Sequence, residues 1–367
     1  MQQKDGKDQQ RYVSRQGDTI VRVARRFGIN MTALLAANPL VTEGEALQAG
    51  TELVVPSAVG LAESQPPPGR GLHADEPAPY GFAELMDDVA ALQRRFSFLH
   101  TETIGTSVLG RRIVALRIGT GGKVWFANAA MHANEWITAP LLVRFAADCA
   151  AALEAGERFR GRDMARLLAE SSVWLVPLVN PDGVELVLTG LPGEPAYDAQ
   201  LLQWNHGVPR FTRWKANIRG VDLNDQFPAG WETERDRRAA EGPGARDYGG
   251  PAPLSEPEAE ALARFTRERD FRLVLAFHTQ GREIYWNYRD YEPPEAEELA
   301  ERFGRVSGYR PVKLSGSDAG YKDWFIAEYR RPGFTVELGF GVNPLPVSQL
   351  DDLYEEAAAI LLAAFDA

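Results

Sequence analysis

The spacing of apolar residues divides the chain into a short first part and a long second part. Over residues 11–56 the pattern predicts the order β-α-α-β, because a strand at Tyr12-Val13 is followed by two short helical patterns and a closing strand at 50–56. The first helical pattern carries Ile20 and Val23 at helical spacing. We therefore expect one small domain at this end of the chain.

Beyond residue 80, apolar runs long enough for buried strands alternate with helical patterns, which predicts an α/β sheet with helices on both faces. Asn180-Pro181-Asp182-Gly183 is typical of a turn, and Ser255-Glu256-Pro257-Glu258 of a capping box that opens a helix. The pattern predicts a hairpin over 104–118, buried strands over 123–130, 172–179, 271–277 and 334–338, and helices over 138–153 and 255–269.

Composition separates the two parts. Residues 57–79 are rich in Pro and Gly, with a run at Pro66-Pro67-Pro68, and this favours a linker that is stiff where polyproline II forms. A chain of 367 residues fits about two domains at roughly 150 residues each. We expect a small domain over 11–56, a linker over 57–79 and a large domain over 80–367.

Charge and cysteine content exclude several classes of protein. With 40 Lys and Arg against 51 Asp and Glu, the formal net charge is −11, which argues against a nucleic-acid partner or a polybasic membrane anchor. One cysteine, Cys149, cannot form an internal disulfide or a Cys-rich zinc module. The pattern shows no 18-residue apolar stretch and no apolar leader near Met1, so at face value we expect a cytoplasmic location and no membrane contact. Oligomeric state is left open.

Candidate chemistry lies where predicted strands end. His132 and Glu135 follow one predicted buried strand, His278 follows another, and Glu337 lies near the end of a third. Ligands of open α/β sheets bind beyond the carboxyl ends of strands. Two His and one Glu are sufficient to hold a catalytic zinc with one open position. For a His-x-x-Glu pair taken alone, a simple hydrogen-bonded His at a strand end is the alternative.

The first part of the chain resembles a LysM module. The resemblance implies binding to glycans that contain N-acetylglucosamine, such as peptidoglycan, with Asp18, Thr19 and Asn38 as candidate glycan contacts. A small β-α-α-β domain without a ligand is the alternative. The residues that carry the resemblance are Tyr12-Val13, Gly17-Asp18-Thr19-Ile20, Ala24, Phe27-Gly28, Asn38-Pro39, Gly50-Thr51-Glu52-Leu53 and Pro56.

The second part resembles the carboxypeptidase A-like zinc metallopeptidases over residues 80–367. The resemblance implies Zn²⁺ bound by His132, Glu135 and His278, with Glu337 as general base, in a mixed, mostly parallel sheet of about eight strands. The ordered motifs are Ile104-Gly105-Thr106-Ser107, Gly110-Arg111, Met131-His132-Ala133-Asn134-Glu135-Trp136, Asn180-Pro181-Asp182-Gly183, Gly220-Val221-Asp222-Leu223-Asn224, Ser255-Glu256-Pro257-Glu258, Phe277-His278 and Thr335-Val336-Glu337-Leu338-Gly339.

A cation should stabilise the oxyanion that forms on the substrate carbonyl. The family uses an Arg shortly before its Asp-x-Asn motif, and alignment through Trp214 places Lys215 at that point. Arg213 and Arg219 lie close by in the sequence. We favour Lys215, with a solvated basic residue before a turn as the alternative.

One departure from the family changes the expected substrate. Family carboxypeptidases read Asn-Arg-Asn-Phe where this chain reads Asn224-Asp225-Gln226-Phe227, so the group that would clamp a C-terminal carboxylate has the opposite charge. The segment 313–317 shows no counterpart of the family's mobile Tyr. A catalytic domain with an acid at Asp225, preceded by a LysM module, resembles the bacterial γ-D-glutamyl-meso-diaminopimelate peptidases, in which these two domains are fused.

That resemblance implies hydrolysis of the amide between the D-Glu side chain and diaminopimelate in peptidoglycan stem peptides. Asp225 would recognise the diaminopimelate ammonium, with Asn224, Arg219 and Arg282 as further substrate contacts and Arg282 facing a carboxylate. The alternative for Asp225 is a structural cap or a salt-bridge partner, and for Arg282 the favoured alternative is a residue without a substrate role. Cell-wall association follows from the module and the substrate. Two alternatives remain: a metallocarboxypeptidase for basic C-terminal residues, and a wall-binding protein that has lost catalysis.

Overall fold

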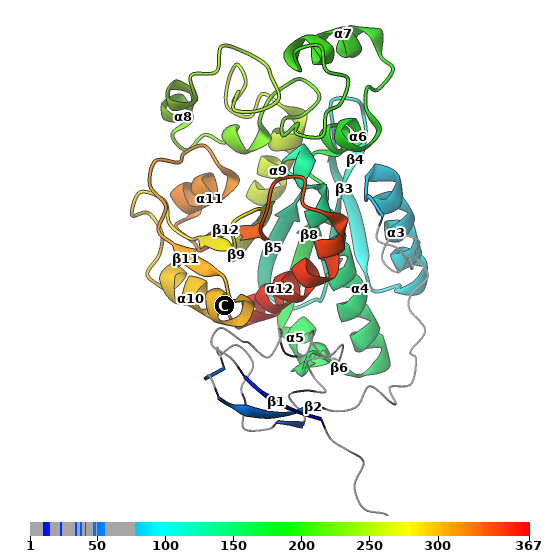
Figure 1. Cartoon of the computed structure of the whole chain (residues 1–367), viewed down its shortest axis with the longest axis vertical. Helices are drawn as coiled ribbons and strands as arrows, with labels where there is room; N and C mark the ends of the chain where they lie inside the picture. The colour runs from blue at the N-terminus through cyan, green and yellow to red at the C-terminus, as the bar shows by residue number, and fades with distance from the viewer. Residues whose placement is uncertain are drawn as a thin grey trace, which may run out of the picture. The chain divides into compact units, whose positions relative to one another are not determined.

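The computed structural model describes residues 10–14, 23, 34, 37–38, 41, 47–48, 50–55 and 78–367. The chain forms an N-terminal unit and a large unit (Figure 1). The N-terminal unit contains the antiparallel strands β1 (Gln10–Val13) and β2 (Glu52–Val55), as the pattern predicted. Val23 and Leu34, both helical, are buried together with residues of β2. Of the candidate glycan contacts, Asp18 and Thr19 lie outside the described residues.

Asn38 holds the N-terminal unit together from inside. Its side-chain amide donates to the carbonyls of Leu34 at 2.7 Å and Val54 at 2.8 Å, and its oxygen accepts from the Val54 N–H at 2.8 Å. The residue is only 8% exposed. Its amide therefore has a structural role in this unit, and its contact with a glycan stays a prediction.

The large unit is built on an eight-stranded sheet, as the resemblance to the zinc metallopeptidases implied. Four neighbouring pairs are parallel and three are antiparallel, so the sheet is mixed and mostly parallel. The order is β11-β10-β12-β9-β5-β8-β4-β3. The strands are β3 (His100–Thr106), β4 (Arg112–Ile118), β5 (Lys123–Ala129), β8 (Ser171–Val176), β9 (Leu273–Thr279), β10 (Glu283–Tyr285), β11 (Arg310–Val312) and β12 (Gly333–Leu338).

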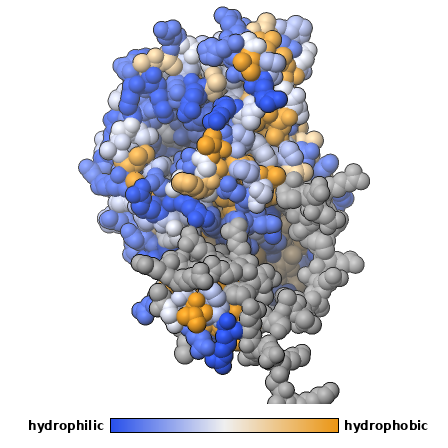
Figure 2. All heavy atoms as spheres, viewed as in Figure 1, coloured by the Kyte–Doolittle hydropathy of each residue, from blue (hydrophilic) through white to orange (hydrophobic). Residues whose placement is uncertain are grey.

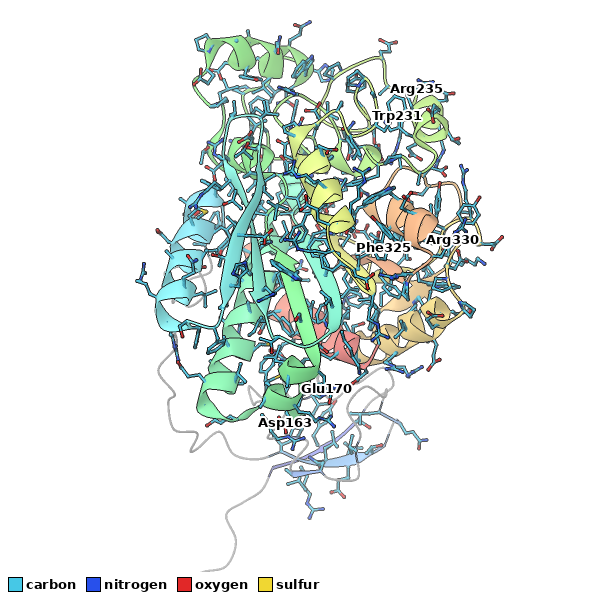
Figure 3. All side chains as sticks on the ribbon, turned by 180° about the vertical axis from the view of Figure 1, so that it is seen from behind. Asp163, Glu170, Trp231, Arg235, Phe325 and Arg330 are labelled. Atoms are coloured by element: carbon cyan, nitrogen blue, oxygen red, sulfur yellow. The ribbon has the colours of Figure 1, made fainter. Side chains whose placement is uncertain are left out.

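Helices cover both faces of this sheet. Figures 1 and 3, which view it from opposite sides, show α4 (Ala139–Ala155) and α12 (Leu350–Ala363) on one face and α9 (Pro257–Arg267) and α11 (Tyr321–Tyr329) on the other. Successive side chains of β5 point to opposite faces of the sheet. Trp125 packs edge-on against Phe365, which follows α12 on one face, and Phe126 packs against Phe265 of α9 on the other. The strand is therefore apolar along most of its length.

The remaining elements lie around this core. They are α3 (Phe82–Arg95), η1 (Ala133–Thr138), β6 (Arg158–Phe159), β7 (Arg162–Asp163), α5 (Met164–Glu170), α6 (Pro181–Thr189), α7 (Pro195–Trp204), η2 (Leu223–Asp225), α8 (Trp231–Arg238), α10 (Glu295–Ser307), η3 (Val347–Gln349) and η4 (Ala364–Asp366). In Figure 3, Asp163 and Glu170 mark the two ends of α5.

The predicted turn at Asn180 and the predicted capping box at Ser255 differ from the structure. The expected turn at Asn180 is the start of α6: the Asn180 side chain accepts from the Gly183 N–H at 3.0 Å, and Pro181 occupies the first helical turn. The expected capping box at Ser255 is absent. α9 begins one residue later than a Ser255 cap requires, because the Ser255 hydroxyl contacts the Gln226 side chain at 3.2 Å instead.

One helix is more apolar than the sequence reading allowed. By length and composition alone, the 23 residues Ala133–Ala155 contain an apolar window of 18 residues that could cross a membrane. In the structure 78% of that apolar window is buried inside the large unit, against the sheet and α12. The expectation of no such stretch was wrong, and burial as a core helix explains the composition.

Candidate metal centre

Strand pairing brings the four predicted groups to one end of the sheet. β5 and β9 are parallel neighbours, and His132 follows the end of β5. His278 is the second-to-last residue of β9, whereas the sequence predicted that it follows the strand. β12 pairs with the other side of β9 in a register that sets Glu337 opposite His278. Glu135 lies in η1, directly after β5. The carboxyl ends of three parallel strands thus supply the site, as expected for an open α/β sheet.

The three predicted ligands converge on one point. Glu135 lies between the rings: its Oε1 is 3.0 Å from His132 Nδ1 and its Oε2 is 3.0 Å from His278 Nδ1. The two Nδ1 atoms are 3.1 Å apart. Donors bound at about 2.0–2.1 Å around one tetrahedral ion lie about 3.3 Å from one another, so these separations fit a single small ion. All three residues are buried.

Asp222, an acidic residue to which the sequence analysis gave no role, contacts the predicted metal ligand His132. Asp222 Oδ1 lies 3.2 Å from His132 Nε2, on the side of the ring away from the ligand atom. Metal-binding imidazoles usually give their second nitrogen to a carboxylate, which fixes the tautomer and the ring orientation. Asp222 is the first acid of the quoted Asp-x-Asn motif, and that position was the signal that could have identified it.

The charges around the site oppose one another. Burial disfavours a charged His132, but Glu135 and Asp222 outweigh it and raise the pKa of His132 to about 9. Burial and the nearby Glu135 carboxylate raise the pKa of Glu337 to about 8, while the charges of His132 and Lys215 act to lower it. Glu337 is therefore a carboxyl group that can hold a proton near neutral pH.

Lys215 lies beside the cluster, where the sequence reading expected a cation. Its Nζ is 3.6 Å from Asp222 Oδ2 and the side chain is 16% exposed. Burial opposes its charge, but Asp222 and Glu135 keep the pKa of Lys215 above its usual value. The backbone locks its place, because the Lys215 carbonyl accepts from the Ala133 N–H at 2.9 Å.

Arg219 and Arg213 do not share this position. Arg219 is half exposed and points to Glu256, with Nη1 and Oε2 3.7 Å apart. Arg213 uses its carbonyl to accept from the Asn134 side chain at 3.4 Å. The role of Arg219 as a substrate contact stays a prediction, and its charge lies at the start of α9.

The expected ammonium site at Asp225 already has a cation. Arg238 Nε, at the end of α8, lies 3.3 Å from Asp225 Oδ2, and Asp225 is only 4% exposed. Figure 3 labels Trp231 and Arg235 on this helix. The guanidinium carbon of Arg235 lies 5.2 Å from the centre of the Trp231 indole ring. Burial and Asp222 raise the pKa of Asp225 to about 7. Asp225 is therefore an ion-pair partner of Arg238, and its recognition of a substrate ammonium stays a prediction.

Two other expected substrate contacts also have internal partners. The Asn224 side-chain oxygen accepts from the Tyr321 N–H at 3.3 Å, at the start of α11. Arg282 forms an ion pair with Glu356 of α12. The Glu356 carboxylate also accepts a hydrogen bond from the Tyr309 hydroxyl. Arg282 is thus directed toward α12, and its contact with a substrate carboxylate stays a prediction. Sequence spacing gave no sign of either partner, because they lie in distant segments.

A pocket of about 380 Å³ lies next to the Asn224 contact. Its walls come from the segments after β10 and β11 and from the first turn of α11. Three cations and three acids line it: Arg289, Lys313, Lys322, Asp290, Asp318 and Asp323. Lys322 is 4% exposed and donates to the Asn287 carbonyl at 2.6 Å and to the Asp323 carboxylate. The pocket is therefore polar, with charges of both signs.

Fold and site together define a metallopeptidase. Residues 84–360 match the family described as zinc carboxypeptidase, and residues 12–56 match the LysM domain. The first match covers more than half of the chain, so the protein belongs to the zinc carboxypeptidase family and carries an N-terminal LysM domain.

Among the relatives, gamma-D-glutamyl-L-diamino acid endopeptidase 1 of Lysinibacillus sphaericus is 52% identical over 284 residues, which cover 77% of this chain and 72% of that protein. The uncharacterized protein YqgT of Bacillus subtilis is 44% identical, with 72% of each chain covered. Among solved structures, thrombin activatable fibrinolysis inhibitor has a TM-score of 0.64 at 20% identity, over 78% of this chain and 73% of that chain. This last likeness shows a shared fold.

Proposed function

We propose that the protein is a zinc-dependent peptidase that hydrolyses the bond between the D-Glu γ-carboxyl group and meso-diaminopimelate in peptidoglycan stem peptides. The observation that carries the proposal is the 52% identity to a γ-D-glutamyl-diamino acid endopeptidase, over a length that covers 77% of this chain. The LysM domain would hold the enzyme on N-acetylglucosamine-containing strands of the same polymer. Stem peptides and glycan strands are thus the proposed partners, and the cell wall or its fragments the proposed place of action.

The chain's own groups have distinct roles in this reaction. Zn²⁺ held by His132, Glu135 and His278 supplies the Lewis acidity that polarises a carbonyl and acidifies water. Glu337 takes a proton from the attacking water and returns it to the leaving amine. The Lys215 ammonium supplies positive charge beside the carbonyl oxygen as it becomes an oxyanion.

The mixed-charge pocket supports a diamino acid as the leaving group. Diaminopimelate has a second amino-acid centre, which bears an ammonium and a carboxylate on one carbon. An ammonium group has three donors, and Lys322 uses two on Asn287 and Asp323, which leaves the third for the substrate carboxylate. Asp290 is 86% exposed at its side chain and pairs with Lys313 at 2.9 Å, so this pair offers charges of both signs to the second centre of the substrate. We propose these residues as substrate contacts beside Asp225 and Arg282.

The proposal is tested by digestion of L-Ala-γ-D-Glu-meso-diaminopimelate with the zinc-loaded enzyme, followed by mass spectrometry. We expect free diaminopimelate and L-Ala-D-Glu. Glu337→Gln should bind zinc normally and lose about 10²–10⁴-fold in rate, because only proton transfer is removed. Removal of zinc with a chelator should abolish cleavage and added zinc should restore it.

Three outcomes would contradict the proposal. Faster cleavage of a hippuryl-Lys substrate than of the γ-D-glutamyl peptide would favour a carboxypeptidase for basic residues. Retention by Glu337→Gln of every effect on the wall would favour a binding protein without catalysis. Release of the same products by the chelated enzyme would exclude a metal-dependent mechanism.

A further inference from the structure

The segment that follows β12 returns to the metal ligands. In Figure 1 it is the orange-red connection from β12 to α12. Hydrogen bonds hold its first residue on both sides. The Gly281 N–H, in the turn after β9, donates to the Gly339 carbonyl at 3.0 Å, and the Gly339 N–H donates to the hydroxyl of Tyr309, just before β11, at 3.0 Å. Asn343, further along the segment, is thereby brought beside the end of β9.

Asn343 forms a reciprocal pair with Thr279, the residue after His278. Its amide donates to the Thr279 carbonyl at 2.7 Å, and its oxygen accepts from the Thr279 hydroxyl at 2.8 Å. The amide has a second N–H, which lies toward the metal ligand Glu135, with Nδ2 and Oε1 3.2 Å apart. The pair with Thr279 fixes the direction in which this donor points.

Both oxygens of Glu135 are held from outside the cluster. Oε1 accepts from Asn343, and Oε2 accepts from the Thr279 N–H at 3.2 Å. The terminal torsion of a Glu side chain has a broad range, so an unsupported carboxylate rotates easily. Two donors on separate oxygens restrict that rotation and leave the remaining lone pairs directed at the two imidazole Nδ1 atoms.

We propose that Asn343 is a positioning residue for metal binding, which presets the Glu135 carboxylate in the orientation that a zinc ion needs. The role belongs to a side chain that does not touch the metal, and it depends on Thr279 to aim the amide. The proposal concerns binding of the ion and not the bond that is cleaved, so it stands or falls separately from the proposed substrate.

A matched control lies next to Asn343. Val342 is 58% exposed and Phe340 is 73% exposed on the same segment. Apolar atoms are visible on the molecular face over the β12–α12 connection (Figure 2). Val342→Ala changes this segment at its surface and should leave the Glu135 carboxylate in place.

The experiment measures the affinity of the full-length metal-free protein for Zn²⁺ by competition with a chromophoric chelator at fixed pH. Asn343→Ala should bind Zn²⁺ about 10–100-fold more weakly, as for other groups that orient metal ligands, and Val342→Ala should match the wild type. Thr279→Val should weaken binding, Thr279→Ser should restore it, and Thr279→Val should add little in the Asn343→Ala background. Thermal midpoints of the metal-free proteins report folding separately.

The proposal is overturned if Asn343→Ala binds Zn²⁺ within twofold of the wild type, or if Val342→Ala loses as much affinity. Additive losses for Asn343→Ala and Thr279→Val would also overturn it, because the two side chains would then act independently. Should Asn343→Ala fail to fold, the Thr279→Val and Thr279→Ser pair carries the same test: equal affinities for these two variants would contradict the proposal.

Discussion

Glu258 illustrates how burial sets the charge of single residues in the large unit. It lies in the first turn of α9 and is fully buried, where its side chain accepts from the Val108 N–H at 3.1 Å and from the Asn217 amide at 3.3 Å. Burial outweighs these two hydrogen bonds and raises its pKa from 4.5 to about 7. The folded protein therefore binds this proton more tightly than the unfolded chain does.

This difference makes a prediction about stability and pH. A raised folded pKa contributes stability that is fully present below pH 4.5 and is lost as the pH rises through about 7, by about 3 kcal/mol for a single group. Glu258→Gln keeps an acceptor for Val108 but does not titrate. Urea unfolding at pH 5 and pH 8 should show a smaller loss of stability for the variant than for the wild type. Equal losses would contradict the assignment.

At this scale the sequence predicted which residues lie together in the buried cluster better than it predicted the residues around them. His132, Glu135, His278 and Glu337 were identified because strand ends and motif order single them out. Their supporting groups, Asp222, Arg238 and Asn343, lie in loops or on a polar helix without periodicity. Their partners come from distant segments, so only the folded chain shows the ion pairs and hydrogen bonds that they form.

Among the elements, the start of α6 joins three segments around the site. The Asn180 amide donates to the carbonyls of Met131 at 3.1 Å and Ala216 at 3.2 Å, while its oxygen caps the helix at Gly183. Met131 precedes the ligand His132, and Ala216 follows Lys215. One buried side chain thus fixes a metal ligand and the proposed oxyanion cation relative to each other.

Loss of this side chain should therefore affect stability and activity together. We expect Asn180→Ala to lower the free energy of unfolding by about 2–4 kcal/mol, because a cap is lost and two buried carbonyls lose their donor. Activity of the folded fraction should fall as well, since the segments of His132 and Lys215 are released. Asn180→Asp, which keeps the cap but not the amide donors, separates the two effects. Wild-type stability of Asn180→Ala in urea unfolding would contradict this account.

Apolar runs predicted the strands of the large unit because burial on both faces leaves a strong signal in the sequence. The polar starts of helices were predicted less well. At Asn180 the turn signal was a helix cap, since Pro181 fits the first turn of a helix as well as a turn. At Ser255 a contact with Gln226, distant in sequence, displaced the local hydrogen bond that a capping box requires.

At the scale of the whole molecule, two units with separate cores divide binding from catalysis. The large unit has its own sheet and core, and the metal ligands all come from it. We expect a chain that begins at Pro79 to cleave a soluble stem peptide within about twofold of the full-length rate. On insoluble peptidoglycan its rate should fall about tenfold or more, because the LysM domain no longer raises the local concentration of substrate.

Release of diaminopimelate from both substrates, measured by mass spectrometry, checks this division of roles. The soluble peptide is the internal control for folding of the shortened enzyme. Equal rates of the two proteins on insoluble peptidoglycan would show that the N-terminal unit does not contribute to substrate capture.

The pairing of β9 with β12 limits where the chain can accept an inserted residue. Glu337 faces His278 across one ladder of hydrogen bonds, and neighbouring residues of a strand point to opposite faces of the sheet. A shift of β12 by one residue would carry the general base to the far face, among the core side chains. An insertion within 333–337 should therefore abolish catalysis while every catalytic residue remains present, whereas an insertion in the polar segment after β11 leaves their spacing unchanged.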